Sequence, residues 1–200
     1  MELTGGDLNR LKKVGSRKIE GLGARTFAGV STDSRSTKTG EIFFALKGDK
    51  FDGHSFLKDA FAGGAAVAVV EATSEAAANL DAPLIIVKNT TTSLGELANL
   101  HRLKFSVPVV AIGRSNGKTT TKEMIAQVLR TSYRVLSTEG NFNNNIGVPL
   151  TLLKFGSEHE VAVVEIGTNH PGEIDSLCKI LDPTHGLRSE ERRVGKECRL

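Results

Sequence analysis

Short apolar runs alternate with segments of helical periodicity through most of the chain. In the first half, three such runs are typical of buried strands: Glu41–Leu46, Ala65–Val70 and Leu84–Val87. Residues 55–62 and 74–80 separate these runs and have the composition of short helices, the first with Ser55 as its expected N-cap. Strands and helices that alternate in this way predict a small α/β domain over residues 1–90.

The alternation restarts after an expected boundary between Lys88 and Thr92, with a helix over residues 92–105. Strands are predicted at residues 109–112, 133–136 and 161–166, and helices at residues 118–130, 148–153 and 171–180. Residues 182–187 resemble the approach to one more strand, which we do not expect to form because the apolar run stops at Leu187. The pattern therefore predicts a second α/β domain over residues 91–187, truncated so that a central strand lacks a partner.

Composition is ordinary for a soluble globular protein, with 39% hydrophobic and 24% charged residues among 200. No apolar stretch is long enough to cross a membrane. The start, MELTGGDLNRLKK, lacks the apolar segment of a signal peptide. We therefore expect a cytoplasmic protein, in which Cys178 and Cys198 are reduced thiols rather than a disulfide.

The net charge of +3 is concentrated in the last thirteen residues, which hold five basic and three acidic side chains. The remaining 187 residues carry 21 basic and 20 acidic side chains, and this near-neutral body argues against a nucleic-acid partner. Residues 188–200 also resemble the translation of a common sequencing adapter. We expect a non-native, disordered tail there; the alternative is a basic interaction tail.

A glycine-containing loop between an expected strand and an expected helix has the context of a phosphate-binding loop. Lys118 would reach the outer phosphates of a nucleotide, and the Thr119 hydroxyl would contact Mg²⁺. The alternative is an ordinary strand–helix turn, since the spacing is not that of a strict P-loop. The candidate ATP-binding residues are Gly113, Arg114, Ser115, Asn116, Gly117, Lys118, Thr119 and Thr120. This loop alone would suit kinases, ATPases, GTPases and ligases equally.

Eight segments in a fixed order narrow the choice: STDSR (31–35), GEIFFALKG (40–48), FDGHSF (51–56), HR (101–102), VVAI (109–112), SNGKTTTKEM (115–124), GNFNNNIGVPLTLL (140–153) and VEIGTNHPGEI (164–174). Together they resemble the ATP-dependent Mur ligases of peptidoglycan synthesis. The resemblance implies a small N-terminal α/β UDP-binding domain followed by a P-loop-type parallel-sheet ATPase domain, here truncated.

The resemblance implies that the first domain binds the UDP end of a muramoyl-peptide. Arg35 would suit the diphosphate, because its planar fork donates two parallel hydrogen bonds. Without the resemblance, Arg35 would be a surface arginine and His54 a residue that caps a turn. The implied substrate-binding residues in this domain are Ser31, Asp33, Ser34, Arg35, Lys47, Gly48 and His54.

In the second domain the resemblance implies binding of MgATP, with Lys118 and Glu165 as catalytic residues. Glu165 would end a buried strand and hold Mg²⁺ together with Thr119; the alternative is a solvated glutamate. Asn141, Asn144 and His170 would contact substrate, or would be polar turn residues.

Within the family, the segments favour the branch that joins D-Ala-D-Ala to UDP-N-acetylmuramoyl-tripeptide. ATP would convert the tripeptide carboxylate into an acyl phosphate, which the amine of D-Ala-D-Ala then attacks. Alternatives are a sister ligase that adds the third amino acid, a UDP-sugar-binding module without turnover, or another P-loop enzyme. We expect a monomer whose given chain is an inactive fragment.

One departure from the family pattern affects the loop. Gly113-Arg114 stands where the family has Thr-Gly, and a glycine there would allow close approach to phosphate. Arg114 is therefore expected to weaken ATP binding.

Overall fold

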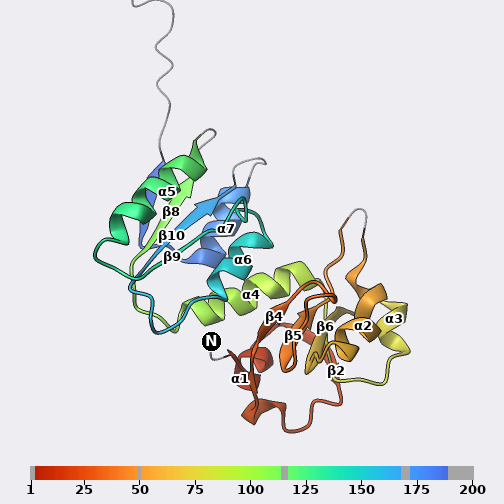
Figure 1. Cartoon of the computed structure of the whole chain (residues 1–200). Coiled ribbons are helices and arrows are strands. Elements are labelled where there is room, and N and C mark those ends of the chain that lie inside the picture. The colour runs from red at the N-terminus through yellow and green to blue at the C-terminus, as the bar shows by residue number, and fades with distance from the viewer. Residues whose placement is uncertain (1–2, 49–50, 114–116, 168–171, 189–200) are drawn as a thin grey trace, which may run out of the picture.

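The computed structural model describes residues 3–48, 51–113, 117–167 and 172–188 of the chain. Two lobes, each built on its own β-sheet, lie on either side of helix α4 (Thr90–Arg102) (Figure 1). The mixed α/β architecture agrees with the class predicted from the sequence.

The first sheet has five strands in the order β2 (Lys13–Arg17), β7 (Leu84–Val87), β6 (Val67–Glu71), β5 (Glu41–Phe44) and β4 (Gly29–Ser31). Strands β4 to β7 are parallel, and β2 pairs with β7 in the antiparallel direction. Both faces of this sheet are covered, which explains why its central strands are continuous apolar runs rather than alternating ones.

Helices α2 (Leu57–Ala62) and α3 (Glu75–Ala78) belong to the lobe of the first sheet. Phe43 and Val70 point to one face, where they pack with Leu57 of α2 and Ala77 of α3. The residues next to them in sequence along β5 and β6 point to the opposite face and join a larger core with α1 (Gly5–Asn9) and α4. The period-two geometry of a strand thus divides each run between two cores.

The second sheet is parallel throughout, in the order β11 (His185–Arg188), β8 (Val109–Gly113), β10 (Val161–Ile166) and β9 (Val135–Ser137). Ile112 and Val163 form a small core with Ala126 of α5 (Lys118–Leu129) on one face. The other face packs with α6 (Gly147–Leu152) and α7 (Glu173–Leu181). The carboxyl ends of β8 and β10 consequently lie side by side, where parallel α/β sheets bind ligands.

Helix α4 connects the two lobes by packing as well as by sequence. Its buried residues Leu94, Leu97 and Ala98 belong to a single apolar cluster that includes side chains from both sheets. Buried Asp7 of α1 forms a capping box with Thr4, the N-cap residue of this helix. Asp7 also forms a 2.7 Å ion pair with Lys104, which lies just beyond the end of α4. These contacts join α4 to both lobes.

Several sequence-based expectations about the elements are wrong in detail. The weakly patterned start forms β1 (Leu3–Thr4), α1, β2, η1 (Leu22–Ala24), β3 (Thr26–Phe27) and β4, none of which the periodicity predicted. The helix expected over residues 55–62 is a 3-10 turn, η2 (Gly53–Phe56), followed by α2, and Asp52 rather than Ser55 caps it through the amide of His54. Helix α7 begins at Glu173, two residues later than predicted.

The largest correction concerns the last strand. Strand β11 does form, and its residues pair in parallel with Val110 to Gly113 of β8. Strand β8 therefore has a neighbour on both sides, and the expected unpaired central strand is not present in the described residues. The sequence pattern concealed β11 because all four of its residues are exposed, so that it lacks an apolar run. Arg188, expected in the tail, ends this strand; residues 189–200 lie outside the described part.

Among the described residues, no helix is both long and apolar enough to cross a lipid bilayer.

Candidate functional site

The first candidate site lies at the carboxyl ends of β8 and β10, where the sequence predicts a phosphate-binding loop. Strand β8 ends at Gly113, and Gly117 precedes α5 with a φ of 70°, a left-handed conformation that favours glycine. Residues 114–116 lie outside the described part. Half-buried Lys118 is the first residue of α5, and exposed Thr119 and Thr120 follow in the same turn. The backbone amide groups and the dipole of this helix start favour an anion.

Glu165 is the central side chain of this site. It lies in β10 opposite Ile112 of β8 and is only 2% exposed, which rules out the solvated alternative. The Thr119 hydroxyl donates a hydrogen bond of 2.9 Å to Glu165 Oε2, and the side-chain amide of Asn143 donates one of 2.7 Å to Glu165 Oε1. The two residues predicted to hold a metal ion are therefore in direct contact across 46 positions of sequence.

Asn143 was missed at the sequence level, although it lies between the two asparagines that were predicted to bind substrate. Asn144 braces the turn before α6, because its side-chain oxygen accepts hydrogen bonds from the backbone amides of Ile146 and Gly147. Asn141 is exposed near the end of β9. Gly147 allows this loop to fold closely, since a Cβ there would lie 2.4 Å from the Cα of Phe142. The run of asparagines indicates a polar loop in the sequence, but it does not indicate that Asn143 is the one that contacts Glu165.

The oxygen atoms of Thr119 and Glu165 fit a magnesium ion. Mg²⁺ prefers octahedral oxygen ligands at about 2.0–2.1 Å, so two neighbouring ligands are about 2.9 Å apart. The observed distance between Thr119 Oγ1 and Glu165 Oε2 is 2.9 Å. No cluster of three or more His, Cys, Asp or Glu side chains that could hold a metal occurs in the described residues. A single carboxylate, a hydroxyl and nucleotide phosphates form the usual ligand set for Mg²⁺.

The second candidate site is a cavity of about 820 Å³ in the first lobe, at the carboxyl ends of β4 and β5. Four residues predicted to bind substrate line it: Asp33, Ser34, Arg35 and Gly48. Phe51 and Phe56 also line it, and both rings are largely exposed at 75% and 40%. Exposed aromatic rings beside an arginine suit a ligand that combines a flat ring with a negative charge.

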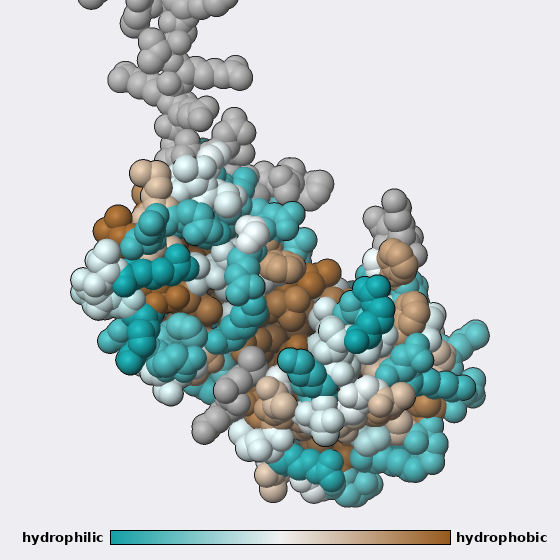
Figure 2. Space-filling view, viewed as in Figure 1, coloured by the Kyte–Doolittle hydropathy of each residue, from teal (hydrophilic) through white to brown (hydrophobic). Residues whose placement is uncertain are grey.

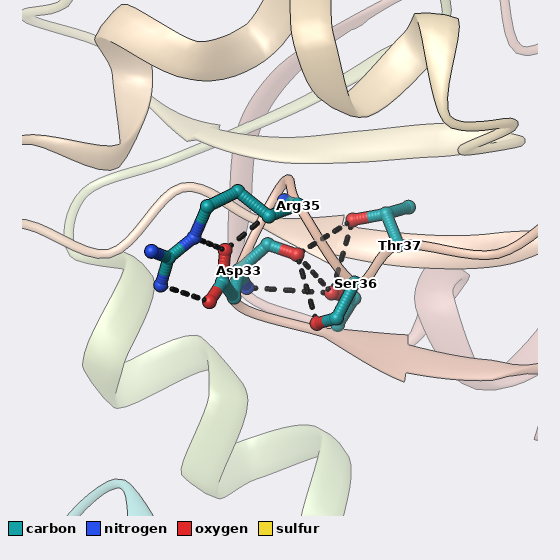
Figure 3. A network of polar contacts seen from close by, with 5 residues as sticks. Asp33, Arg35, Ser36 and Thr37 are labelled. Atoms are coloured by element: carbon teal, nitrogen blue, oxygen red, sulfur yellow. Dashed lines mark hydrogen bonds and ion pairs between the residues drawn. The ribbon is translucent and has the colours of Figure 1, made fainter.

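Within this cavity, Arg35 folds back onto Asp33 (Figure 3). Its Nε atom donates to Asp33 Oδ1 over 2.9 Å, and Nη2 donates to Oδ2 over 2.7 Å. Hydrogen bonds from the Arg35 side chain and backbone lower the pKa of Asp33 to about 2. The guanidinium is 88% exposed, so it is oriented by Asp33 while its outer edge remains accessible to a ligand.

The remaining predicted residues of the first lobe do not line this cavity. Ser31 is buried and braces the loop, because its hydroxyl donates to the Asp33 carbonyl oxygen and accepts a hydrogen bond from Thr37. His54 is 3% exposed, and its two ring nitrogens contact Asp52 Oδ1 at 2.5 Å and the Glu71 amide at 2.9 Å. Lys47 is exposed and forms an isolated β-bridge with Asp52. The structure thus places His54 and Ser31 beneath the site; His170 lies outside the described residues.

A groove extends from the second candidate site toward the second lobe. A smaller cavity of about 390 Å³ is lined by Val30, Thr32 and Asp33 of the first lobe and by Phe142, Leu150 and Lys154 of the second. Thr32 and Asp33 also line the larger cavity, so the two cavities are adjacent. Figure 2 shows hydrophobic surface gathered between the two lobes. An extended ligand anchored beside Arg35 would therefore have a path toward the second lobe.

The fold and these sites define an α/β protein with a nucleotide-type site at the ends of a parallel sheet. Comparison with known proteins makes the class specific. Residues 26–102 match the Mur ligase family, catalytic domain, and residues 112–189 match the Mur ligase middle domain. The chain belongs to the Mur ligase family.

Several relatives belong to one branch of that family. The chain is 44% identical over 162 residues to UDP-N-acetylmuramoyl-tripeptide–D-alanyl-D-alanine ligase of Haemophilus influenzae, an alignment that covers 79% of this chain and 35% of the relative. A crystal structure of MurF from Acinetobacter baumannii matches with a TM-score of 0.84 and 34% identity, covering 94% of this chain and 41% of that one.

A third match bears on the nucleotide. The structure of MurF ligase from Thermotoga maritima in complex with ADP matches with a TM-score of 0.70 and 35% identity, covering 78% of this chain and 35% of that one. The chain thus spans between about a third and two fifths of the length of these relatives.

Proposed function

We propose that this chain forms the UDP-substrate-binding and ATP-binding portions of a ligase that joins D-Ala-D-Ala to UDP-N-acetylmuramoyl-tripeptide. The observation that carries the proposal is the contact between Thr119 and Glu165 at the amino end of α5. It brings a hydroxyl and a buried carboxylate together beside Lys118, where a nucleotide triphosphate and Mg²⁺ would bind. The family likeness then supports a ligase rather than a kinase.

Each lobe would contribute a separate part of the reaction. Arg35 and the cavity around it would bind the UDP end of the substrate, and the groove lined by Phe142 and Lys154 would direct the peptide toward Lys118. The terminal carboxylate would attack the γ-phosphorus of ATP and release ADP. The D-Ala-D-Ala amine would then attack the acyl phosphate, forming an amide bond and releasing inorganic phosphate.

Lys118 would neutralise charge on the phosphoryl group as it moves between the two oxygens. Thr119 and Glu165 would hold Mg²⁺, which would supply further charge neutralisation to the phosphates. Asn143 holds the Glu165 carboxylate in place through its 2.7 Å hydrogen bond. We also propose that the protein acts as a monomer in the cytoplasm.

A chimera would test this proposal. Residues 1–187 would replace the matching segment of the Haemophilus influenzae relative, and phosphate release from ATP would be measured with two UDP substrates and two amino acceptors. We expect release that requires both the UDP-muramoyl-tripeptide and D-Ala-D-Ala. Equal or better turnover with the UDP-muramoyl-dipeptide would favour the sister ligase that adds the third amino acid.

Binding measurements on the chain itself complement the chimera. Isothermal titration of UDP-muramoyl-tripeptide and of MgATP should give two independent sites. Binding of the UDP ligand without any nucleotide binding would favour a UDP-sugar-binding module and contradict the proposal.

A further inference from the structure

A fully buried lysine lies beneath the candidate metal site. Lys122 is on the inner face of α5, one turn after Lys118, and its side chain is 0% exposed. The other buried residue of this helix is Ala126, which packs with Ile112 and Val163 of the sheet. An ammonium group at such a position costs several kcal/mol unless it is well paired. A methionine or leucine would satisfy the packing of this helix face without that cost.

The Lys122 ammonium has two partners. It donates a hydrogen bond of 2.5 Å to the backbone carbonyl of Thr138, and it forms an ion pair of 2.7 Å with Glu123 Oε1. Hydrogen bonding to Lys122 lowers the pKa of Glu123, so this carboxylate stays ionised at neutral pH. The lysine thus ties α5 to the residue that follows β9.

Thr138 continues this chain of contacts to the metal site. It is 1% exposed, and its hydroxyl oxygen accepts a hydrogen bond of 2.9 Å from the backbone amide of Glu165. The backbone amide of Thr138 donates to the carbonyl of Val163, which lies in β10 together with Glu165. Thr138 is therefore held by Lys122 on one side and by the Glu165 segment of β10 on the other.

Both ends of this chain coincide with the proposed magnesium ligands. Thr119 precedes Lys122 by three positions on the same helix, and Glu165 is the residue that Thr138 contacts. The contacts form a closed loop from Thr119 along α5 to Lys122, through Thr138 to Glu165, and back to Thr119 over 2.9 Å. A closed loop of this kind fixes the distance between the two oxygen atoms.

We infer that Lys122 is a positioning residue, which holds the Thr119 and Glu165 oxygens at the spacing that a magnesium–nucleotide complex requires. The inference rests on the proposed function, because it assumes that a nucleotide and Mg²⁺ bind at this site. Lys122 itself touches neither oxygen. Its effect is therefore on the added affinity that Mg²⁺ gives to a nucleotide, and not on the contacts between phosphate and the helix start.

The test compares ADP affinity with and without Mg²⁺, measured by calorimetry on the full chain. Partners that orient metal ligands typically change metal affinity by about 10- to 100-fold when they are removed. We expect Lys122→Met to reduce the Mg²⁺-dependent gain in ADP affinity by about tenfold and to leave the Mg²⁺-free affinity within about twofold. Lys179→Met is the matched control, because Lys179 also pairs with an acid on its own helix but is 75% exposed.

Substitutions of Thr138 provide a second test in which Lys122 is unchanged. Thr138→Val removes the hydroxyl with little change in shape, and we expect it to reduce the Mg²⁺-dependent gain as well. Thr138→Ser keeps the hydroxyl and should restore the gain. This pair keeps the inference testable if Lys122→Met does not fold.

Hydrogen exchange at the Glu165 amide, measured without any nucleotide, separates the inference from the proposed function. Faster exchange in Lys122→Met than in Lys179→Met would support the connection through Thr138. An unchanged Mg²⁺-dependent gain, or an equal loss of affinity with and without Mg²⁺, would overturn the inference. Absence of ADP binding by the unaltered chain would overturn the proposed function, whereas unchanged exchange of the Glu165 amide in Lys122→Met would overturn the inference by itself.

Discussion

The two lobes hold their candidate binding groups in opposite ways. In the second lobe, the carboxylate of Glu165 is buried and its two oxygens contact Thr119 and Asn143 from separate elements. In the first lobe, Arg35 is exposed and is paired with Asp33, two residues away in the same loop. One site is assembled by the tertiary fold, whereas the other is a local arrangement at the mouth of a cavity.

This contrast follows from what each site would bind. A small cation demands a fixed spacing of oxygen ligands, and a buried network supplies it because interior side chains cannot relax freely. A nucleotide diphosphate linked to a sugar is large, and an exposed arginine can adapt to it with little reorganisation of the core. Under the proposed function, binding in the second lobe should therefore be sensitive to single buried atoms, and binding in the first lobe should depend on charge and surface shape.

The largest expected effect is on the buried site. Glu165→Gln keeps the shape of the side chain but removes the charge that would hold Mg²⁺, so the Mg²⁺-dependent gain in nucleotide affinity should fall by about 100-fold. Calorimetry with and without Mg²⁺ measures this. Glu160→Gln is the control, because Glu160 is exposed just before the same strand. A gain that survives Glu165→Gln would remove the metal role from this residue.

In the exposed site, Arg35→Ala should weaken binding of UDP-muramoyl-tripeptide by about 30-fold, since hydrogen bonds to charged groups contribute about 1.5–3 kcal/mol. Arg35→Lys should recover only part of the loss, because an ammonium lacks the planar fork. Exposed Arg25 offers the control Arg25→Ala. The pKa of Asp33, lowered to about 2, keeps the pair with Arg35 ionised above about pH 3. Equal affinities for Arg35→Ala and Arg25→Ala would count against the proposed diphosphate contact.

A double substitution in the glycine-containing loop tests a departure from the family pattern. Changing Gly113→Thr and Arg114→Gly together restores the family order, and we expect ATP affinity to rise by about tenfold, because a glycine at position 114 allows close approach to phosphate. The effect should be confined to nucleotide binding and should leave affinity for the UDP ligand unchanged. Unaltered ATP affinity would show that Arg114 is accommodated without cost.

The smallest expected effect concerns α4, the helix between the lobes. His101 is 1% exposed and donates a 3.0 Å hydrogen bond to the Phe155 carbonyl, and burial lowers its pKa. In the unfolded chain, His101 would bind a proton below about pH 6.5, whereas in the folded chain its burial opposes protonation. The free energy of unfolding should therefore decline as pH falls below that value.

His101→Gln should reduce this pH dependence. Between pH 7 and pH 5, we expect the unfolding temperature of the variant to drop by about 2 °C less than that of the unaltered chain. Exposed His185→Gln is the control. The same drop in all three proteins would show that His101 does not titrate with unfolding.

Much of the central architecture could be predicted from the sequence. The runs that became β6, β7, β8 and β10 are apolar because both faces of each sheet are covered, and this requirement is visible in sequence. Thr119 and Glu165 were also predicted, from a helix start rich in Gly, Lys and Thr and from the end of a buried strand. Strand β11 was missed because an exposed edge strand needs no apolar run.

Other features depended on contacts that no local pattern reports. The sequence does not distinguish Asn143, which faces Glu165, from its asparagine neighbours, nor does it show that His54 is buried. Lys122 is a charged residue of the kind usually exposed on a helix. Its side chain is nevertheless buried, and its ammonium contacts the Thr138 carbonyl and the Glu123 carboxylate.

The sequence by itself therefore determined the two α/β lobes, the family and the candidate pair of Thr119 and Glu165, because hydrophobic periodicity and ordered motifs are properties of neighbouring residues. Only the tertiary structure decided which polar side chains are enclosed and which line a cavity. Enclosure depends on segments far apart in the chain, and their packing sets whether a charge contacts water or a single fixed partner.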